Sequence, residues 1–366
     1  MFEPINLLNI FDNDQFMGRM VISPERLCVF EYDPDYLSNG VSLSPFYLPL
    51  QAGAFTARRD PFNGLFGLFN DSLPDGWGNL LIDRYLLKNN IQPGSLSLLD
   101  KLSLIGKSGM GILSYEPDYA FKSKGQIDDL NLLALEVHKI LIENKYKSGM
   151  LDDLIEMGGS SGGARPKVLI NIKGDPWIVK FRSAHDPENM GEIEYQYSII
   201  AKKCGIEMPE TQLLEGKYFG VKRFDRSNGK RIHIHSASGL LYADHRFPSL
   251  DYVDLIKIAF ELTKNIEEAY TLFRRMVFNI LTGNKDDHAK NVSFIMKNKQ
   301  WLVSPAYDLV PSSGYDGNHS TTILNKGNAD KNDILEVAKL CSLDKKKAEH
   351  IFDDVYSNCE EIRIQI

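Results

Sequence analysis

The chain contains 366 residues and carries a formal net charge of −7 at pH 7, with hydrophobic residues at 43% and charged residues at 25%. This composition is ordinary for a globular protein, and the length predicts two or three packed units. The acidic balance argues against a protein that wraps nucleic acid, because such binding depends on Lys and Arg side chains that neutralise phosphates.

Two further patterns narrow the class of protein. The four cysteines are scattered along the chain and form no Cys-x-x-Cys pair, so they indicate neither a disulfide framework nor a zinc ribbon. The first residues lack the basic and apolar pattern of a secretion signal, and no apolar run approaches the ~18 residues of a membrane span. A cytoplasmic protein is therefore expected.

Short runs of alternating apolar and polar residues dominate the first hundred positions. Residues 19–23 and 27–32 are examples, and the Pro, Gly, Asn and Asp residues between such runs predict a strand-rich unit. The spacing of apolar residues over 79–87 and 128–144 fits one face of a helix. Gly158 and Gly159 are then typical of a helix end followed by a turn.

The pattern changes after this turn. Residues 167–181 hold two apolar runs around a Lys-Gly-Asp-Pro turn, which predicts a hairpin, and a helix is expected from about 191 to 204. A strand is expected over 218–225. Helices are predicted over 251–264 and 266–282, a second hairpin over 292–303, and two amphipathic stretches close the chain. The sequence thus predicts an α+β fold, strand-rich at first and mainly helical later.

Residues 284–291 read Asn-Lys-Asp-Asp-His-Ala-Lys-Asn, and a second acidic motif, Ser-Pro-Ala-Tyr-Asp, covers 304–308. Phosphoryl transfer from a nucleotide needs one carboxylate to orient the attacking hydroxyl, and an amide oxygen with a second carboxylate to hold magnesium. Asp286, Asn291 and Asp308 can supply these groups in that order. The spacing from Asp286 to Asn291 equals that of the protein-kinase catalytic loop. These residues predict a kinase that uses ATP and Mg²⁺.

A simpler interpretation is that Asp and Asn occur here because they favour turns. The second hairpin argues for the kinase, since it is expected to return Asp308 to the end at which Asp286 and Asn291 lie. His288 lies inside the same loop and is a candidate to orient Asp286.

A glycine- and serine-rich loop over 158–167 leads into the first hairpin. Its backbone N–H groups could surround phosphate oxygens, although a flexible linker has the same composition. Lys180 lies in the following apolar strand, where an unpaired ammonium is costly to bury. In a kinase such a lysine binds the α and β phosphates beside a helix glutamate, for which Glu192 and Glu194 are candidates. The alternative is a solvent-facing lysine on an edge strand.

The strand around 221–225 is the expected hinge, where an adenine ring could stack on an aromatic residue, although Phe224 is by default a core aromatic. Gly106-Lys-Ser is similar to the end of a P-loop, but Lys101 stands where that pattern needs glycine. We therefore expect a structural turn from Gly106 to Gly111. His233 and His235 alternate on a predicted strand and are expected to line its surface rather than to bind a metal.

Four stretches, 160–167, 221–226, 286–291 and 305–308, resemble the HipA family of bacterial toxin kinases in order and spacing. Residues 73–79 and 109–115 are similar to that family's amino-terminal subdomain, so the resemblance covers nearly the whole chain. It implies a serine/threonine protein kinase with a two-lobed, protein-kinase-like α+β fold. The implied domains are a HipA N-terminal subdomain at 1–120, an N-lobe core with the glycine-rich loop and hinge at 121–224, and a helical C-lobe at 225–366.

The resemblance also implies roles for single residues. Asp286 matches the catalytic base, Asn291 and Asp308 the magnesium ligands, and Lys180 the phosphate-binding lysine. Other residues implied to bind the nucleotide are Ser160, Ser161, Gly162, Gly163, Ala164, Lys167, Lys222, Phe224 and Tyr307. Ser160 or Ser161 matches the serine that family members autophosphorylate, an event that withdraws the glycine-rich loop and inactivates the enzyme.

The partners follow from the resemblance alone. Family members typically phosphorylate an aminoacyl-tRNA synthetase and are restrained by a small helix-turn-helix antitoxin, so contact with DNA would be indirect and no membrane partner is expected. Two other functions stay compatible with the sequence. One is a small-molecule kinase with the same base and metal ligands, and the other is a non-catalytic co-repressor partner of a DNA-binding antitoxin.

Overall fold

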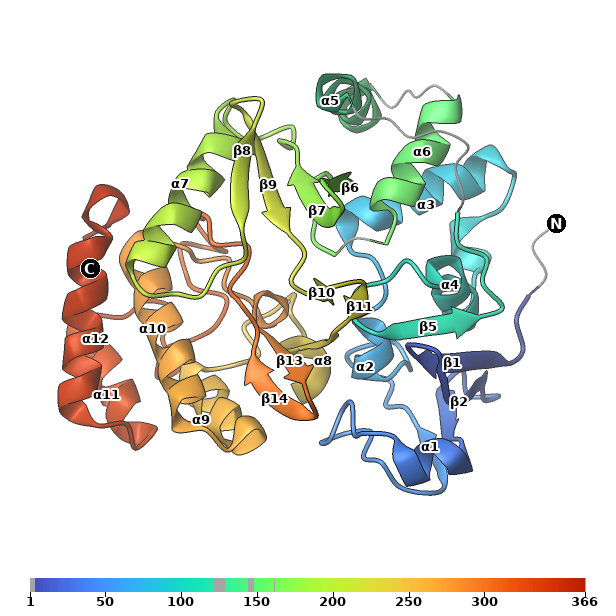
Figure 1. Cartoon of the computed structure of the whole chain (residues 1–366), viewed down its shortest axis with the longest axis horizontal. Helices are drawn as coiled ribbons and strands as arrows, with labels where there is room; N and C mark the ends of the chain where they lie inside the picture. The colour runs from blue at the N-terminus through green and yellow to red at the C-terminus, as the bar shows by residue number, and fades with distance from the viewer. Residues whose placement is uncertain (1–3, 122–128, 144–147, 161, 366) are drawn as a thin grey trace. The chain divides into compact units, whose positions relative to one another are not determined.

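The computed structural model describes residues 4–121, 129–143, 148–160 and 162–365 of the chain (Figure 1). The chain divides into two compact units. The first comprises Met1–Gly191 with Gln212–His233, and the second comprises Glu192–Thr211 with Ile234–Ile366. Within the described ranges, no helix combines the length and the apolar character that crossing a membrane requires.

A five-stranded antiparallel sheet opens the first unit, in the order β4-β3-β2-β1-β5. Its strands are β1 (Leu8–Asp12), β2 (Gln15–Ile22), β3 (Cys28–Tyr32), β4 (Ala54–Thr56) and β5 (Leu113–Glu116). Alternate residues of β3, namely Cys28, Phe30 and Tyr32, are buried, as expected for a sheet with one face against a core. The predicted strand-rich start of the chain is confirmed.

A second sheet of four strands in the same unit has the order β6-β7-β9-β8. The strands are β6 (Lys167–Ile172), β7 (Asp175–Lys180), β8 (Thr211–Leu214, whose first residue belongs to the second unit) and β9 (Tyr218–Lys222). Val168 and Val179 are cross-strand neighbours on one face, and both belong to a buried cluster with residues of α3, α5 and α6. Three helices therefore cover one face of this sheet, and the predicted first hairpin is confirmed as β6 and β7.

The helices of the first unit are α1 (Pro34–Asn39), α2 (Gly67–Asn70), α3 (Gly76–Lys88), α4 (Leu98–Ile105), α5 (Leu130–His138) and α6 (Ser148–Gly158), with a 3-10 turn η1 (Pro93–Ser95) and a π-helical turn η2 (Lys139–Glu143). The helix expected over 128–144 is thus an α-helix followed by a π-turn. A two-stranded ribbon, β10 (Arg226–Ser227) and β11 (Lys230–Arg231), follows β9.

The second unit is mainly helical, as predicted. Its elements are α7 (Met190–Lys203, whose first two residues belong to the first unit), β12 (His233–Ser236, whose first residue belongs to the first unit), α8 (Ala237–Leu241), α9 (Tyr252–Thr263), α10 (Ile266–Thr282), η3 (Ala289–Asn291), β13 (Ser293–Lys297), β14 (Gln300–Val303), α11 (Lys331–Leu340), α12 (Lys345–Asn358) and η4 (Glu360–Ile362). One apolar core joins these elements, with α10 supplying Phe273, Met276, Val277 and Phe278, all completely buried. The predicted α+β fold is confirmed.

One expectation about single residues is wrong, and one alternative is excluded. His233 and His235 do not line a surface, because their exposed fractions are only 3% and 0%, and the Nε2 atom of His233 lies 2.9 Å from the carbonyl oxygen of Leu43. The alternative of a solvent-facing Lys180 on an edge strand is also excluded. β7 lies between β6 and β9, and Lys180 is only 9% exposed.

Candidate active site

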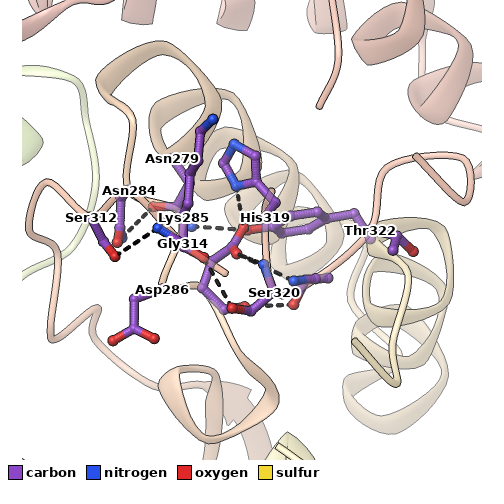
Figure 2. A network of polar contacts seen from close by, with 12 residues as sticks. Asn279, Asn284, Lys285, Asp286, Ser312, Gly314, His319, Ser320 and Thr322 are labelled. Carbon is purple, nitrogen blue, oxygen red and sulfur yellow. Dashed lines mark hydrogen bonds and ion pairs between the residues drawn. The ribbon is translucent and has the colours of Figure 1, made fainter. Parts of the chain in front are cut away.

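The loop that follows α10 carries the proposed base. The helix ends at Gly283, whose φ of +67° lies in the left-handed region that glycine adopts at little cost. The Asp286 side chain is 55% exposed, whereas Asp287 beside it is buried. In Figure 2 the Asp286 carboxylate points away from the hydrogen-bonded network behind it. Consecutive acidic residues of this loop thus face opposite environments.

Two residues of the same loop contact Asp286. The Nε2 atom of His288 lies 3.8 Å from its Oδ1 atom, close enough for an electrostatic contact but too far for a hydrogen bond. Asn291 donates a 2.6 Å hydrogen bond from Nδ2 to the Asp286 carbonyl. Because this bond uses the amide nitrogen, the amide oxygen Oδ1 is the atom of Asn291 that a cation could bind.

The second predicted hairpin, β13 and β14, brings the Asp308 segment back to this loop. Phe294 pairs with Val303, and the backbone N–H of Ser304 then donates to the Ser293 carbonyl at 2.9 Å. Beyond that point, the Tyr307 hydroxyl lies 2.5 Å from Ser293 Oγ and 2.7 Å from the Lys290 carbonyl oxygen. The chain just before Asp308 therefore lies against the residue just before Asn291.

Asp308 itself has φ of +54°, a left-handed conformation that is uncommon for a residue other than glycine. Aspartate tolerates this region better than most residues, because its short polar side chain can bond locally. Such strained positions are enriched at functional sites. The hydroxyl of Tyr307, a residue expected at an adenine pocket, joins the hairpin to the loop that precedes it.

The first unit contains two buried lysines that are cross-strand neighbours. Lys167 of β6 pairs with Lys180 of β7, and their exposed fractions are 6% and 9%. Since side chains alternate along a strand, both lie on the sheet face opposite Val168 and Val179, away from the helix-covered side. Lys167 donates from Nζ to the Gly162 carbonyl at 2.6 Å, and Lys180 Nζ lies 5.6 Å from the centre of the Phe219 ring.

The glycine-rich loop is held from both sides. Gly163 has φ of +85° and donates its N–H to Asp75 Oδ2 at 2.9 Å. A Cβ atom on Gly163 would meet only the end of the flexible Lys167 side chain, so the positive φ is what favours glycine at this position. Ser160 is 8% exposed and donates from Oγ to the Ser108 carbonyl at 3.2 Å. Ser161 lies outside the described residues, and Ala164 lies beside Gly76.

The residues expected near the adenine follow β9. Lys222 forms an ion pair with Asp175, with 2.5 Å between Nζ and Oδ2, on a partly exposed part of the sheet. Phe224 is half-buried. The structure therefore places Lys167, Lys180, Lys222, Phe224 and the described loop residues in the first unit. It places Asp286, His288, Asn291, Tyr307 and Asp308 in the second unit.

Sequence reasoning missed a cluster of charged residues just after Phe224. Asp225 is 1% exposed and binds Arg223, Arg226 and the backbone N–H of Gly111. Burial alone would raise the pKa of the Asp225 carboxyl, but the Arg223 and Arg226 guanidinium groups beside it hold that pKa below its usual value. The opposite charges of neighbouring residues over 223–226 are the sequence pattern that could have indicated this cluster.

Arg226 and Arg231 complete this cluster by binding the turn expected from Gly106 to Gly111. Arg226 donates to the carbonyls of Gly109 and Gly111, and Arg231 donates to those two carbonyls and to that of Leu113. The turn therefore has a structural role, and the ribbon β10–β11 is the element that contacts it.

Comparison with known families separates this chain into two matched regions. Residues 159–362 match the HipA-like C-terminal domain, and residues 8–116 match the HipA N-terminal domain. The chain belongs to the HipA family. The C-terminal match includes the glycine-rich loop, both lysines and the two acidic motifs, so the family assignment covers the residues described above.

Relatives of this HipA-family chain carry kinase names. A protein of Sinorhizobium fredii named "Putative kinase Y4dM" is 28% identical over 323 residues, which cover 80% of this chain and 74% of that protein. The serine/threonine-protein kinase toxin HipA of Shewanella oneidensis is 22% identical over 322 residues, covering 78% of this chain and 70% of the toxin.

A solved structure of Shewanella oneidensis HipA, in complex with HipB and operator DNA, matches the fold with a TM-score of 0.70. The match covers 95% of this chain and 88% of that one at 19% identity. The fold is therefore that of HipA.

Proposed function

We propose that this HipA-family chain is an ATP- and magnesium-dependent serine/threonine protein kinase with Asp286 as its base. In the proposed step, Asp286 accepts the proton of a serine or threonine hydroxyl while that oxygen attacks the γ-phosphorus. The bond from the γ-phosphorus to the β,γ-bridging oxygen breaks, and ADP leaves. The observation that carries the proposal is the half-exposed Asp286 carboxylate on a loop whose backbone is bound by Asn291.

The chemistry of the donor set fits a magnesium ion. Mg²⁺ prefers oxygen ligands, usually one or two from the protein with the rest from phosphates and water. Asn291 offers its amide oxygen and Asp308 its carboxylate, and the contacts of Tyr307 hold the segments of these two residues together. When bound, the metal would neutralise charge on the β and γ phosphates.

The face of the first unit that carries Lys167 and Lys180 would receive the phosphates. Like charges that lie opposite each other in a sheet destabilise it, and bound phosphate oxygens would offset that repulsion. The glycine-rich loop supports the same proposal, since Lys167 binds its carbonyl at Gly162 and the loop N–H groups could bind oxygen anions. Lys222, Phe224 and Tyr307 are proposed to lie near the adenine.

Replacing the proposed base tests this function. Asp286→Asn keeps the side-chain shape and removes the base, so transfer of phosphate from γ-labelled ATP to protein should fall by roughly 10²- to 10⁴-fold. Glu261→Gln, which removes a charge from an exposed position of α9, is the matched control and should transfer phosphate normally. Undiminished transfer by Asp286→Asn would refute the assignment of the base.

The substrate and partners are proposed from the relatives. We propose a toxin-like kinase that phosphorylates a translation component such as an aminoacyl-tRNA synthetase, autophosphorylates on Ser160 or Ser161, and pairs with a small DNA-binding antitoxin. Support comes from the HipA toxin of Shewanella oneidensis and from its structure with HipB and operator DNA. Comparing phosphorylated proteins in cells that express the wild type or Asp286→Asn would identify the substrate. Phosphate only on small molecules would refute a protein kinase.

A further inference from the structure

Asp287, the neighbour of the proposed base, is a buried carboxylate surrounded by hydrogen-bond donors. The Tyr252 hydroxyl donates to Oδ2 at 2.7 Å, and His319 Nδ1 lies 2.9 Å from the same oxygen. The backbone N–H groups of Ser320 and Thr321 donate to Oδ1 at 2.9 and 3.2 Å. Because a carboxylate only accepts, His319 carries its proton on Nδ1. Both carboxylate oxygens of Asp287 therefore accept hydrogen bonds, and Figure 2 labels two of the residues that donate them, His319 and Ser320.

The backbone on both sides of Asp286 is held as well. The Lys285 carbonyl accepts hydrogen bonds from the backbone N–H of Ser320 at 3.1 Å and from its hydroxyl at 3.0 Å. The Asp287 carbonyl accepts from the Thr321 hydroxyl at 2.5 Å. With the Asn291 bond to the Asp286 carbonyl, the three carbonyls from 285 to 287 are all bound, while the Asp286 side chain is 55% exposed.

The network continues into the helices beneath the loop. The Tyr252 hydroxyl accepts from Asn279 Nδ2 at 2.9 Å, and Asn279 Oδ1 accepts from Asn284 Nδ2 at 3.0 Å. Burial, and next the Asp287 carboxylate, raise the pKa of Tyr252 well above its usual value, so its hydroxyl stays a donor at neutral pH. Residues of α9, α10 and the 319–321 segment thus converge on Asp287.

We propose that Asp287 is a positioning residue for phosphoryl transfer: with Tyr252 and His319 it locks the loop so that the Asp286 carboxylate is held in place for the attacking hydroxyl. The inference rests on the proposed function of Asp286. A group displaced by about 1 Å can cost roughly 10²-fold in rate, so a lock made of several hydrogen bonds has a direct effect on turnover.

Substitutions at His319 and Tyr252 distinguish a positioning role of Asp287 from a role in folding stability alone. His319→Leu removes the donor to Asp287, whereas His319→Asn places an amide N–H near the position of Nδ1. Tyr252→Phe removes the other side-chain donor with little change in shape. The measurement is the rate of phosphate incorporation into the chain itself from γ-labelled Mg-ATP, over a range of ATP concentrations and alongside the melting temperature. This gives a maximal rate and a half-saturating ATP concentration.

We expect His319→Leu and Tyr252→Phe to lower the maximal rate by roughly tenfold to a hundredfold, with half-saturation changed less than about twofold. His319→Asn should recover most of the rate. Val337→Ala, which truncates a completely buried side chain of α11, is the control for destabilisation alone. It should lower the melting temperature and leave the maximal rate unchanged.

The outcomes distinguish two failures. If Asp286→Asn is inactive while His319→Leu and Tyr252→Phe both turn over at the wild-type rate, the positioning role is refuted and the base assignment stands. A rate that falls in Val337→Ala in proportion to melting temperature also refutes the positioning role. If Asp286→Asn is active, or the wild type incorporates no phosphate, the proposed function itself fails.

Discussion

Lys167 and Lys180 lie directly opposite each other on neighbouring antiparallel strands, and both are buried. Two ammonium groups so placed repel each other when the protein is empty and attract an anion when one is present. The binding of a nucleotide at these two lysines should therefore change the thermal stability of the first unit, which can be measured.

Lys180→Met should weaken Mg-ATP binding by roughly tenfold or more, since a desolvated hydrogen bond to a charged group contributes about 1.5–3 kcal/mol. The melting temperature of the nucleotide-free protein should also change, because the substitution removes one of two opposed charges together with the contact between the Lys180 ammonium and the Phe219 ring. Thermal unfolding with and without Mg-ATP measures both effects. Lys217→Met, at an exposed position, is the control and should keep the full nucleotide-induced shift. An unchanged shift in Lys180→Met would contradict a phosphate site on this face.

A negative charge at position 160 should destabilise the glycine-rich loop. Its hydroxyl is buried and donates to the Ser108 carbonyl, so a carboxylate or phosphate there would lose the donor and face a carbonyl oxygen. We expect Ser160→Asp to expose the 158–167 loop to limited proteolysis and to destabilise the protein by about 1–3 kcal/mol. Ser160→Ala should have a smaller effect. If both variants are cleaved at the same rate as the wild type, the loop does not depend on this contact.

Asn291→Ala should raise the magnesium concentration needed for half-maximal phosphate transfer by roughly tenfold, because it removes the amide oxygen proposed as a ligand. It also removes the hydrogen bond to the Asp286 carbonyl, so the maximal rate should fall as well. A magnesium titration of activity measures both changes. Gln300→Ala, on an exposed position of the adjoining hairpin, serves as the control. Identical magnesium curves for Asn291→Ala and the wild type would exclude Asn291 as a ligand.

Asp225 should make the protein sensitive to acid. Its pKa in the folded protein lies below the value of 3.8 for a free side chain, so the folded state favours the ionised form. This stabilisation is complete at neutral pH, begins to fall as the pH approaches the unfolded-state pKa, and is lost as the pH falls through the folded-state pKa.

Asp225→Asn should therefore be less stable than the wild type by about 3 kcal/mol at pH 7, and the difference should shrink towards pH 3. Urea unfolding at several pH values measures it. Asp175→Asn removes the half-exposed partner of Lys222 and should cost less than about 1 kcal/mol. A difference that does not change with pH would mean that the charge of Asp225 contributes nothing.

Local patterns in the sequence predicted most elements of the fold. The alternation over 167–181 and the amphipathic spacing over 251–282 depend on neighbours in sequence, and β6, β7, α9 and α10 form where expected. The role of Asp287 could not be predicted in this way. Nothing local distinguishes it from Asp286, and its partners Tyr252 and His319 are 35 and 32 residues away in the chain.

The same limit explains the error at His233 and His235. Period-two spacing correctly indicated a strand, but burial depends on what packs against that strand. The acceptor of His233 is the Leu43 carbonyl, 190 residues earlier in the chain. A contact over such a separation leaves no periodic trace in the sequence.

Arg226 and Arg231 donate hydrogen bonds to the turn at Gly109–Leu113. These bonds connect the two matched family domains, because the arginines lie in the C-terminal match and the turn lies in the N-terminal match. A fragment that starts at residue 159 would lose the backbone groups of Gly109–Leu113 that bind Arg226, Arg231 and Asp225, and this charged cluster would then depend on water for those hydrogen bonds. The N-terminal HipA domain is therefore part of the folding unit that carries the glycine-rich loop. A chimera that takes its N-terminal HipA domain from a relative should therefore also take that relative's residues at the positions of the ribbon at 226–231, so that they can bind the new turn.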